Sequence, residues 1–357
     1  MEQLIETTPM NLPGAVRGLP ILIAGPCSAE TEEQTVSTAR ALADAGVKVF
    51  RAGIWKPRTR PGSFEGIGSE AFHWLKRVKE ETGMLTAVEV ANAHHVYEAL
   101  KFGTDILWVG ARTTANPFTV QEIADALRGV SIPVFVKNPV NPDIELWMGA
   151  LERINRAGIS KLGAIHRGFS SNTPSGYRNQ PYWEIPLLLR KKIPSVPLIN
   201  DPSHISGRSD IVCNVAMRAM SLGFDGLIVE SHINPESALS DGKQQLLPSE
   251  LREMKEKISK MSMKANPAEH ADNLDELRSY IDMCDHELLT ALLNRMSLSE
   301  KIGRYKRERK IDIVQNGRWN ELLTSRLAEA KSLGLREEFI RSLFNSIHRE
   351  SVHIQKH

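Results

Sequence analysis

The sequence predicts an α/β fold, a (β/α)8 barrel, followed by an all-helical domain, and three observations lead to this prediction. Short apolar runs rich in β-branched residues occur eight times between residues 21 and 230. Amphipathic segments with helical spacing separate these runs. Beyond residue 273 the strand-like runs stop and helical periodicity continues. Eightfold alternation favours a closed parallel barrel, although a doubly wound sheet shares the alternating order.

The expected strands are short apolar runs that end in polar residues. They begin at residues 21 (ILIAG), 47 (VKVFRAG), 85 (LTAVEV), 106 (ILWVGA), 134 (VFVKNP), 162 (LGAIHRG), 197 (PLINDPSH) and 226 (GLIVESH). The expected helices cover residues 31–45, 69–82, 93–101, 117–127, 143–157, 208–222 and 248–260. Small and polar residues around a Pro at 261–271 indicate a linker. The sequence therefore predicts a barrel domain over residues 1–260 and a helical domain over residues 272–357.

Composition and charge exclude several classes of protein. The 357 residues carry a net charge of +2, which gives no bulk attraction to nucleic acid or to an anionic membrane. No apolar run reaches membrane-spanning length, and the first residues lack the blocks of a signal peptide. The three scattered cysteines fit a reducing compartment. We therefore expect a cytoplasmic protein whose partners include neither nucleic acid nor a membrane.

A barrel of this kind carries its chemistry at the carboxyl ends of the strands and in the loops that follow. Six cations stand at these positions: Arg51, Lys56, Arg58, Arg112, Lys137 and Arg167. Like charges at a common barrel mouth repel one another unless anions lie between them. Guanidinium groups bind phosphate and carboxylate oxygens through paired hydrogen bonds. The sequence therefore predicts substrates that carry phosphate and carboxylate groups.

Four other strand-end residues have the character of metal ligands: Cys27, His204, Glu230 and Asp241. One is soft, one is borderline and two are hard, which suits a divalent transition metal better than magnesium or calcium. The alternative for Cys27 is a small buried apolar side chain. The motifs DPSH and VESH at two other strand ends favour the metal site.

Seven motifs at the strand ends carry a resemblance to a known family. They are AGPCSAE, RAGIWKPRTRPGSFEGIG, VGARTTANP, KNP, IHRGF, DPSHISGRSD and VESHINPESALSDGKQQL. These motifs resemble the type I family of 3-deoxy-D-arabino-heptulosonate 7-phosphate (DAHP) synthases over roughly residues 20–260. The resemblance implies condensation of phosphoenolpyruvate with erythrose 4-phosphate, the first step towards the aromatic amino acids. It also implies the short form of the barrel, without an N-terminal regulatory extension.

The resemblance further implies a role for each matching residue. The metal would be Mn²⁺, with Fe²⁺, Co²⁺ or Zn²⁺ as alternatives. The metal ligands would be Cys27, His204, Glu230 and Asp241. The phosphate of phosphoenolpyruvate would be held by Arg112 and Arg167, and its carboxylate by Arg51, Lys56 and Lys137. Arg58 and Thr59 would bind the aldose phosphate, and Glu89 would lie near the attacking water.

Two alternatives to a DAHP synthase remain open for the barrel. The sister family makes 3-deoxy-octulosonate 8-phosphate from arabinose 5-phosphate, and it resembles KANRS where this chain has KPRT at residues 56–59. The second alternative is a binding module that holds a phosphorylated ligand without turnover. The complete set of candidate metal ligands argues against a binding module.

The helical segment begins with a helix expected to extend from about Asp272 to Lys310. Apolar residues recur on it in steps of three and four, which requires a partner helix and predicts at least a homodimer. Arg295 falls on this seam, and Lys306 follows three turns later on the same side. Two cations between helices indicate a small polyanion as ligand, the alternative being a solvated or RNA-binding charged face. The seam positions are Leu274, Leu277, Ile281, Cys284, Leu288, Ala291, Leu298, Ile302 and Tyr305.

This segment resembles the all-helical chorismate mutases over about residues 272–357. The matching pieces are LDELRSYIDMCDHELLTALLNRMSLSEKIGRYK and FIRSLFNSIHRESVHIQ. The resemblance implies rearrangement of chorismate to prephenate without a cofactor, or a sensor that binds either compound and inhibits the barrel. Gln315 stands where an acidic residue is common, and Trp319 replaces a frequent Glu. The implied site residues are Arg278, donated across the dimer, with Arg295, Lys306, Arg318, Ser351 and Gln355.

Overall fold

We describe the protein from a computed structural model of the full chain. The description covers residues 5–10, 12, 20–56, 62–171, 176–262, 274–313 and 315–356, together with most but not all side chains between 261 and 316. The chain divides into two compact units, a barrel unit up to residue 270 and a helical unit from residue 271, and each is described by itself. Most of the expected linker lies outside the described residues.

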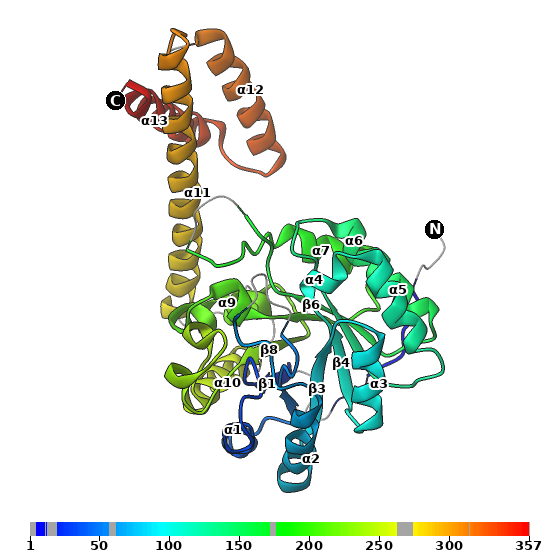
Figure 1. Ribbon diagram of the computed structural model, residues 1–357. Helices are drawn as coiled ribbons and strands as arrows, with labels where there is room; N and C mark the ends of the chain where they lie inside the picture. Colours follow the sequence, from blue (N-terminus) through cyan, green and yellow to red (C-terminus); the bar gives the residue numbers. More distant parts are fainter. Residues whose placement is uncertain are drawn as a thin grey trace. The chain divides into compact units, whose positions relative to one another are not determined.

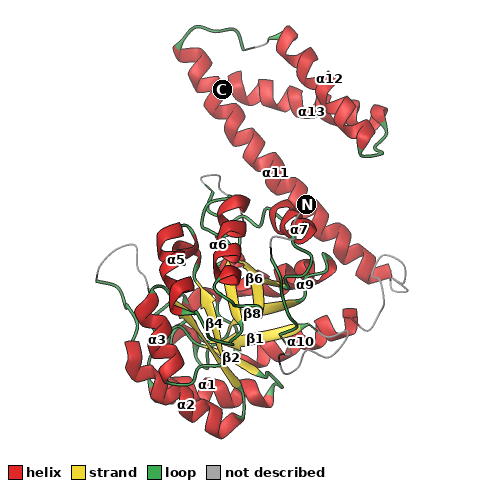
Figure 2. Ribbon diagram, turned by 90° about the vertical axis from the view of Figure 1, so that its right-hand side faces the viewer, coloured by secondary structure: helices red, strands yellow, loops and turns green. Residues whose placement is uncertain are grey.

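Eight parallel strands close into a barrel in chain order, and helices surround them (Figure 1; Figure 2). The first and last strands pair with each other, for example Ile23 with Ile228, so the doubly wound alternative is wrong. Each predicted strand is present. The strands are β1 (Ile21–Gly25), β2 (Val49–Arg51), β3 (Leu85–Val90), β4 (Ile106–Val109), β5 (Val134–Lys137), β6 (Leu162–His166), β7 (Leu198–Asn200) and β8 (Gly226–Glu230).

The seven predicted helices of the barrel are all present, with ends within about four residues of expectation. They are α1 (Glu32–Asp44), α2 (Ala71–Thr82), α3 (Ala93–Lys101), α5 (Pro117–Ala126), α6 (Ile144–Arg156), α9 (Val212–Ser221) and α10 (Pro248–Ser262). Three further helices were not predicted: α7 (Glu184–Lys192) completes the outer ring, and α4 (Ala111–Thr114) and α8 (Pro202–Ser206) are short turns directly after strands. Short 3-10 turns, η1 (Gly68–Glu70), η2 (Ser209–Ile211), η3 (Pro235–Ser237) and η4 (Gly242–Gln244), complete the loops.

The barrel strands are buried on both faces, so they read as continuous apolar runs. Their outward side chains pack under the helices, and their inward side chains, such as Trp108 and Phe135, fill the interior together with Met10 and Leu12 from the N-terminal segment. The buried exceptions at the strand ends are polar: Arg51, Lys137, His166, Asn200 and Glu230. Because buried polar groups require partners, these strand ends hold an extended hydrogen-bonded network.

The helical unit consists of α11 (Leu274–Glu308), α12 (Asn316–Ser332) and α13 (Glu337–Lys356). The long first helix lies within two residues of its predicted bounds at each end. Helix α13 packs against both α11 and α12. At Gly303 the contact is so close that an added Cβ would lie 2.7 Å from the Cα of Gln355. Among the described residues, no helix combines the length and apolar character needed to span a membrane.

Candidate active sites

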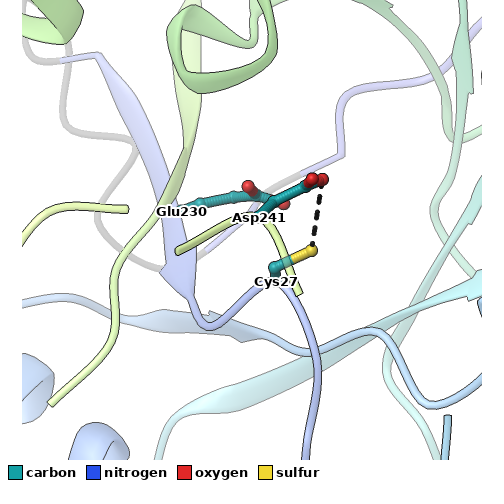
Figure 3. Close-up of side chains that lie close together, drawn as sticks. All are labelled: Cys27, Glu230 and Asp241. Carbon is teal, nitrogen blue, oxygen red and sulfur yellow. Dashed lines mark hydrogen bonds between the residues drawn. The ribbon is translucent and has the colours of Figure 1, made fainter. Parts of the chain in front are cut away.

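Cys27, Glu230 and Asp241 converge at the mouth of the barrel, where their side chains point towards one another (Figure 3). Cys27 follows β1 and Glu230 ends β8, and the register of these neighbouring strands pairs Gly25 with Glu230. Asp241 lies in the left-handed region, with φ 50° and ψ 32°, and its carboxylate points towards the other two side chains (Figure 3). One ligand atom from each of the three lies within 4.8 Å of the others.

His204 lies beside this group, with its Nε2 atom 3.6 Å from Oε1 of Glu230. Its other ring nitrogen, Nδ1, is 2.8 Å from a carboxylate oxygen of Asp201, which begins the turn α8. The Asp201 carboxylate at Nδ1 orients the ring so that Nε2 faces Glu230. The fourth predicted ligand is therefore oriented towards the cluster, just outside the group of three.

The charges of the cluster depend on its burial. Burial is the main cause that raises the pKa of the Cys27 thiol to about 11, with a further contribution from Glu230. Burial acts in the same direction on Glu230, but the charges of His204 and Arg51 outweigh it and lower its pKa. In the absence of a bound metal ion the Cys27 thiol is therefore protonated. Its sulfur lies 3.7 Å from Oδ2 of Asp241.

The donor set fits a divalent transition metal. It offers one sulfur, one imidazole nitrogen with a carboxylate behind it, and two carboxylates from separate elements. Sulfur is a poor ligand for magnesium and calcium, whereas zinc, iron, cobalt and manganese accept mixed sets of this kind. The buried carboxylates also provide the negative charge that a divalent cation requires.

Two predicted carboxylate-binding cations contact this cluster directly. The buried guanidinium of Arg51 lies 3.2 Å from Oε1 of Glu230 and donates a second hydrogen bond to the carbonyl oxygen of Cys27. The ammonium of Lys56 donates to the sulfur of Cys27 at 3.2 Å. Arg51 also stacks over the ring of Trp108, 4.9 Å from its centroid. Both cations are thus held by the same residues that form the candidate metal site.

Lys137 and Glu89 flank the same indole ring from other strands. The Nζ atom of Lys137 is 2.8 Å from Asp201 and 5.9 Å from the centroid of Trp108. The indole N–H of Trp108 donates to Oε2 of Glu89 at 3.2 Å. Gly110 leaves the space for this carboxylate, since an added Cβ would lie 2.0 Å from Oε1 of Glu89. Glu89 therefore has a fixed position inside the mouth.

Arg167 follows β6 and is held from two sides. Its backbone N–H donates to Asn138 at 2.7 Å, and its guanidinium donates to Oδ1 of Asn179 at 2.6 Å. Burial lowers its pKa to about 10, and the positive charges of Arg178 and Arg112 act in the same direction. Arg112 itself is exposed on the turn α4. The charge of Arg112 thus acts on Arg167, and an anion bound between two such guanidinium groups would relieve their repulsion.

Three predicted site residues are not placed by the structure. Arg58 and Thr59 lie outside the described residues, and so does the side chain of Arg278 in α11. Three contributors to the barrel site were missed: Asp201, Arg178 and Gln244. Asp201 belongs to the quoted DPSH motif at a strand end, so that position was a readable signal. Arg178 comes eleven residues after Arg167, in a loop without any strand-end signal.

In the helical unit, α11 and α13 bring two predicted residues together. The guanidinium of Arg295 donates a hydrogen bond to Oγ of Ser351, and burial lowers the pKa of Arg295. Gln355 lies one turn beyond Ser351 and is buried, with no partner for its Oε1 atom among the described residues. Lys306 donates to the carbonyl of Ile313 at 2.8 Å. A cation, a hydroxyl and an amide thus occupy one face between two helices.

Two further predicted positions lie at the start of α12. Arg318 is exposed and pairs with Glu321 at 3.4 Å. Trp319, which departs from the family pattern, stacks on His348 of α13 with ring centroids 3.9 Å apart. Burial and the charge of Arg295 lower the pKa of His348. The indole therefore packs on a neutral ring beside Arg295, where the resemblance leads one to expect a carboxylate.

The barrel and its mouth define an enzyme of the (β/α)8 class that handles anionic substrates beside a candidate metal centre. Comparison with known proteins identifies the family of each part. Residues 15–266 match the model of the DAHP synthetase I family, and residues 277–356 match that of chorismate mutase type II. The chain belongs to the DAHP synthetase I family and carries a C-terminal chorismate mutase domain. It is a bifunctional enzyme of the shikimate pathway, with DAHP synthase and chorismate mutase activities.

Individual relatives include both the heptonate enzyme and the sister octonate enzyme, and the identity to the heptonate aldolase is the higher of these two sequence matches. Phospho-2-dehydro-3-deoxyheptonate aldolase of Thermotoga maritima is 33% identical over 249 residues, which are 69% of this chain and 72% of the relative. The crystal structure of the DAHP synthase of the same organism superposes with a TM-score of 0.64 at 31% identity, covering 72% of this chain and 74% of that one. The 2-dehydro-3-deoxyphosphooctonate aldolase of Wolinella succinogenes is 28% identical over 65% of this chain and 95% of the relative.

Proposed function

We propose that the barrel mouth performs the synthase reaction at a metal centre formed by Cys27, Glu230 and Asp241 with His204. The observation that carries this proposal is the convergence of a thiol and two carboxylates within 4.8 Å, next to the cations Arg51 and Lys56. The metal we propose is Mn²⁺, with Fe²⁺, Co²⁺ or Zn²⁺ as alternatives. Type I enzymes of this family generally depend on a metal.

The residues of the chain bind and orient the two substrates. Carbon 3 of phosphoenolpyruvate is a weak nucleophile. A divalent metal held by the proposed ligands would supply Lewis-acid polarisation of the aldehyde that carbon 3 attacks. The carboxylate of phosphoenolpyruvate is held by Arg51, Lys56 and Lys137. Positive charge that develops at carbon 2 therefore lies beside this fixed carboxylate. Arg112 and Arg167 hold the phosphate that leaves by C–O cleavage. Proximity and preorganised charge provide most of the rate enhancement.

Three further residues complete this proposal. Arg58 and Thr59 bind the phosphate of erythrose 4-phosphate. Glu89 lies near the water that adds to carbon 2, and its hydrogen bond from Trp108 fixes the direction of its carboxylate. In this proposal the metal ligands lie on β1 and β8 with their loops and on α8. The anion-binding cations lie at the ends of β2, β4, β5 and β6 or in the segments that follow these strands.

For the mutase reaction we propose that Arg295, Ser351 and Gln355 bind chorismate together with Lys306, Arg318 and a partner-donated Arg278. The hydrogen bond between Arg295 and Ser351 supports a single anion site between α11 and α13. Rearrangement of chorismate requires no nucleophile, because binding a compact conformer and stabilising charge on the ether oxygen lower the barrier. Lys306 and Gln355 supply that charge stabilisation, and no cofactor takes part.

Removal of metal is the experiment that separates the two proposed sites. EDTA is expected to abolish DAHP formation and to leave chorismate rearrangement unchanged, because the candidate metal ligands found among the described residues lie in the barrel. Both rates are measured on the same purified protein before chelation, after it, and after Mn²⁺ is restored. Loss of both activities, or survival of both, would refute two independent sites. Adding prephenate to the synthase assay tests whether the helical domain has a feedback role. If millimolar prephenate does not inhibit DAHP formation, the domain has no such role.

We also propose that the protein forms at least a dimer through α11. Apolar seam residues of this helix are exposed in the single chain, including Leu288 at 58% and Leu298 at 56%. Such a row of exposed apolar side chains on one helix is typical of a helix–helix interface.

Replacing Leu288 with Glu is expected to convert the dimer into a monomer, because a carboxylate on the seam would be buried without a partner. Light scattering coupled to size exclusion measures the change in mass. The mutase activity should fall with dissociation, since Arg278 comes from the second chain, whereas DAHP formation should persist. Leu333→Glu is the matched control, because Leu333 is 69% exposed after the end of α12. A dimer that persists in Leu288→Glu argues against the α11 seam.

A further inference from the structure

Arg178 reaches the candidate metal site from the loop between β6 and α7. Its guanidinium nitrogen Nη1 lies 3.1 Å from Oδ1 of Asp241 and donates a hydrogen bond to Oε1 of Gln244 at 2.7 Å. The side chain is 46% exposed, and its aliphatic part lies over Gly207. Arg178 is therefore a cation that contacts Asp241, a proposed metal ligand, and remains partly exposed to solvent.

Gln244 extends this contact to the second carboxylate of the cluster. Its side chain is fully buried, and its Nε2 atom donates to Oε2 of Glu230 at 2.6 Å. Because the amide oxygen faces Arg178 and the amide nitrogen faces Glu230, the orientation of Gln244 is determined from both ends. The guanidinium thus neutralises Asp241 directly and is linked to Glu230 through one rigid side chain.

The residue that follows Arg178 connects the cluster to the anion-binding side. Oδ1 of Asn179 accepts a hydrogen bond from Arg167, and its Nδ2 donates to the carbonyl of His204 at 2.7 Å. Gly207, at φ +70°, lets this segment pack closely, since an added Cβ would lie 2.4 Å from the Cβ of Arg178. Two adjacent residues therefore join the proposed metal ligands to a phosphate-binding arginine.

Binding of a divalent cation changes the electrostatic balance at Asp241. A metal that takes the Asp241 carboxylate as a ligand competes with Arg178 for the same oxygen atoms, and two positive groups at one carboxylate repel each other. A long side chain that borders on solvent can turn away at little cost. Arg178 directly precedes Asn179, whose Oδ1 accepts a hydrogen bond from Arg167, so an anion held by Arg167 attracts the Arg178 guanidinium as well.

We propose that Arg178 is a positioning residue that neutralises Asp241 in the metal-free enzyme, yields Asp241 to the divalent cation, and then adds its charge to phosphate binding beside Arg167. This inference rests on the proposed synthase site. It predicts that metal binding and phosphoenolpyruvate binding assist each other. The metal displaces Arg178 from Asp241 and frees its guanidinium for the phosphate, and a bound phosphate draws the same guanidinium away from Asp241. Coupling of this kind is reciprocal.

Replacing Arg178 with Gln tests both parts of the proposal. Mn²⁺ should bind the substrate-free protein about tenfold more tightly, because a charge within about 4–6 Å shifts a binding equilibrium by one or more powers of ten. The KM for phosphoenolpyruvate at saturating Mn²⁺ should rise about tenfold, the usual effect of losing a hydrogen bond to a charged group, while kcat changes less. Titration calorimetry and the paramagnetic resonance signal of free Mn²⁺ measure the binding without turnover.

The control is Arg128→Gln, which removes the same charge from an exposed pair with Asp125 at the end of α5. It should leave both constants unchanged, and Arg178→Lys should retain most of the wild-type KM. Unchanged or weaker Mn²⁺ binding in a folded Arg178→Gln protein overturns the inference, because Arg178 would then support the ligands instead of competing with the metal. If the wild type binds no Mn²⁺ at all, the proposed metal site has failed, and this outcome differs from an unchanged affinity.

Discussion

Cys27→Ala is expected to abolish DAHP formation while the barrel stays folded. The substitution removes the sulfur from the proposed ligand set and leaves two carboxylates and an imidazole. Metal affinity should fall by more than about 100-fold. Loss of a residue that only hydrogen-bonds to a metal ligand already lowers affinity by up to about 100-fold, and loss of the ligand itself should cost more. The synthase rate at a fixed low Mn²⁺ concentration should fall at least as much, and equilibrium dialysis measures the metal that remains bound.

The fold of this variant should change little, since the cavity left by a thiol next to Ser240 and Lys56 is small and polar. Circular dichroism and the chorismate mutase rate report on folding independently of the metal. Cys213→Ala is the control, because Cys213 is a free, half-buried thiol on α9. If Cys27→Ala kept full metal-dependent activity, Cys27 would be the small buried apolar residue of the alternative interpretation.

Arg295→Leu is expected to reduce the mutase rate by roughly two to four powers of ten and to leave DAHP formation intact. The proposed partner of Arg295 is a carboxylate of chorismate, and truncating one member of a buried ion pair costs about 3–5 kcal/mol. At about 1.4 kcal/mol per tenfold change, this cost corresponds to the stated loss. Steady-state rates for both reactions on the same protein measure the effect.

The stability of the helical unit should be preserved or increased in Arg295→Leu. Burial lowers the pKa of Arg295, which indicates that its charge is poorly solvated in the free protein. Ser351 does not lose its only partner, because its hydroxyl also donates to the carbonyl of Ile347 at 2.8 Å. The matched control is Arg304→Leu on the same helix, where an exposed pair with Glu300 contributes little. A variant that unfolds or dissociates, while its remaining dimer still rearranges chorismate, would make Arg295 a structural residue.

Much of the barrel could be predicted from the sequence. The spacing of apolar residues identifies the strands and helices, and the position of polar residues after the strands identifies the mouth. The run ILIAG and the run GLIVE predict strands on their own, and an eightfold alternation predicts that the chain closes. Closure then places Gly25 opposite Glu230, which explains why Cys27 and Glu230 meet although about 200 residues separate them. The helix from Asp272 was equally readable, since its heptad spacing extends over the whole helix.

Other parts of the site were not predictable in this way. Helix α7 follows an irregular loop and was missed, although EIPLLLRKK forms a regular helix. Arg178 comes from that same loop, and no spacing in the sequence relates it to Asp241, 63 residues later. Gln244 could be noticed in SDGKQQ, but its amide has a role only because Glu230 and Arg178 lie on its two sides.

The sequence by itself determined the order of strands and helices, the residues at the strand ends and the families that they resemble, because these depend on local period and on residue type. Only the tertiary structure decided which of these polar groups pair. Arg51 contacts Glu230, Lys137 contacts Asp201 and Arg295 contacts Ser351, and each contact joins residues far apart in the chain. Partner choice of this kind depends on the distance and burial of groups that closure of the barrel and packing of the helices bring together, and a linear pattern contains neither quantity.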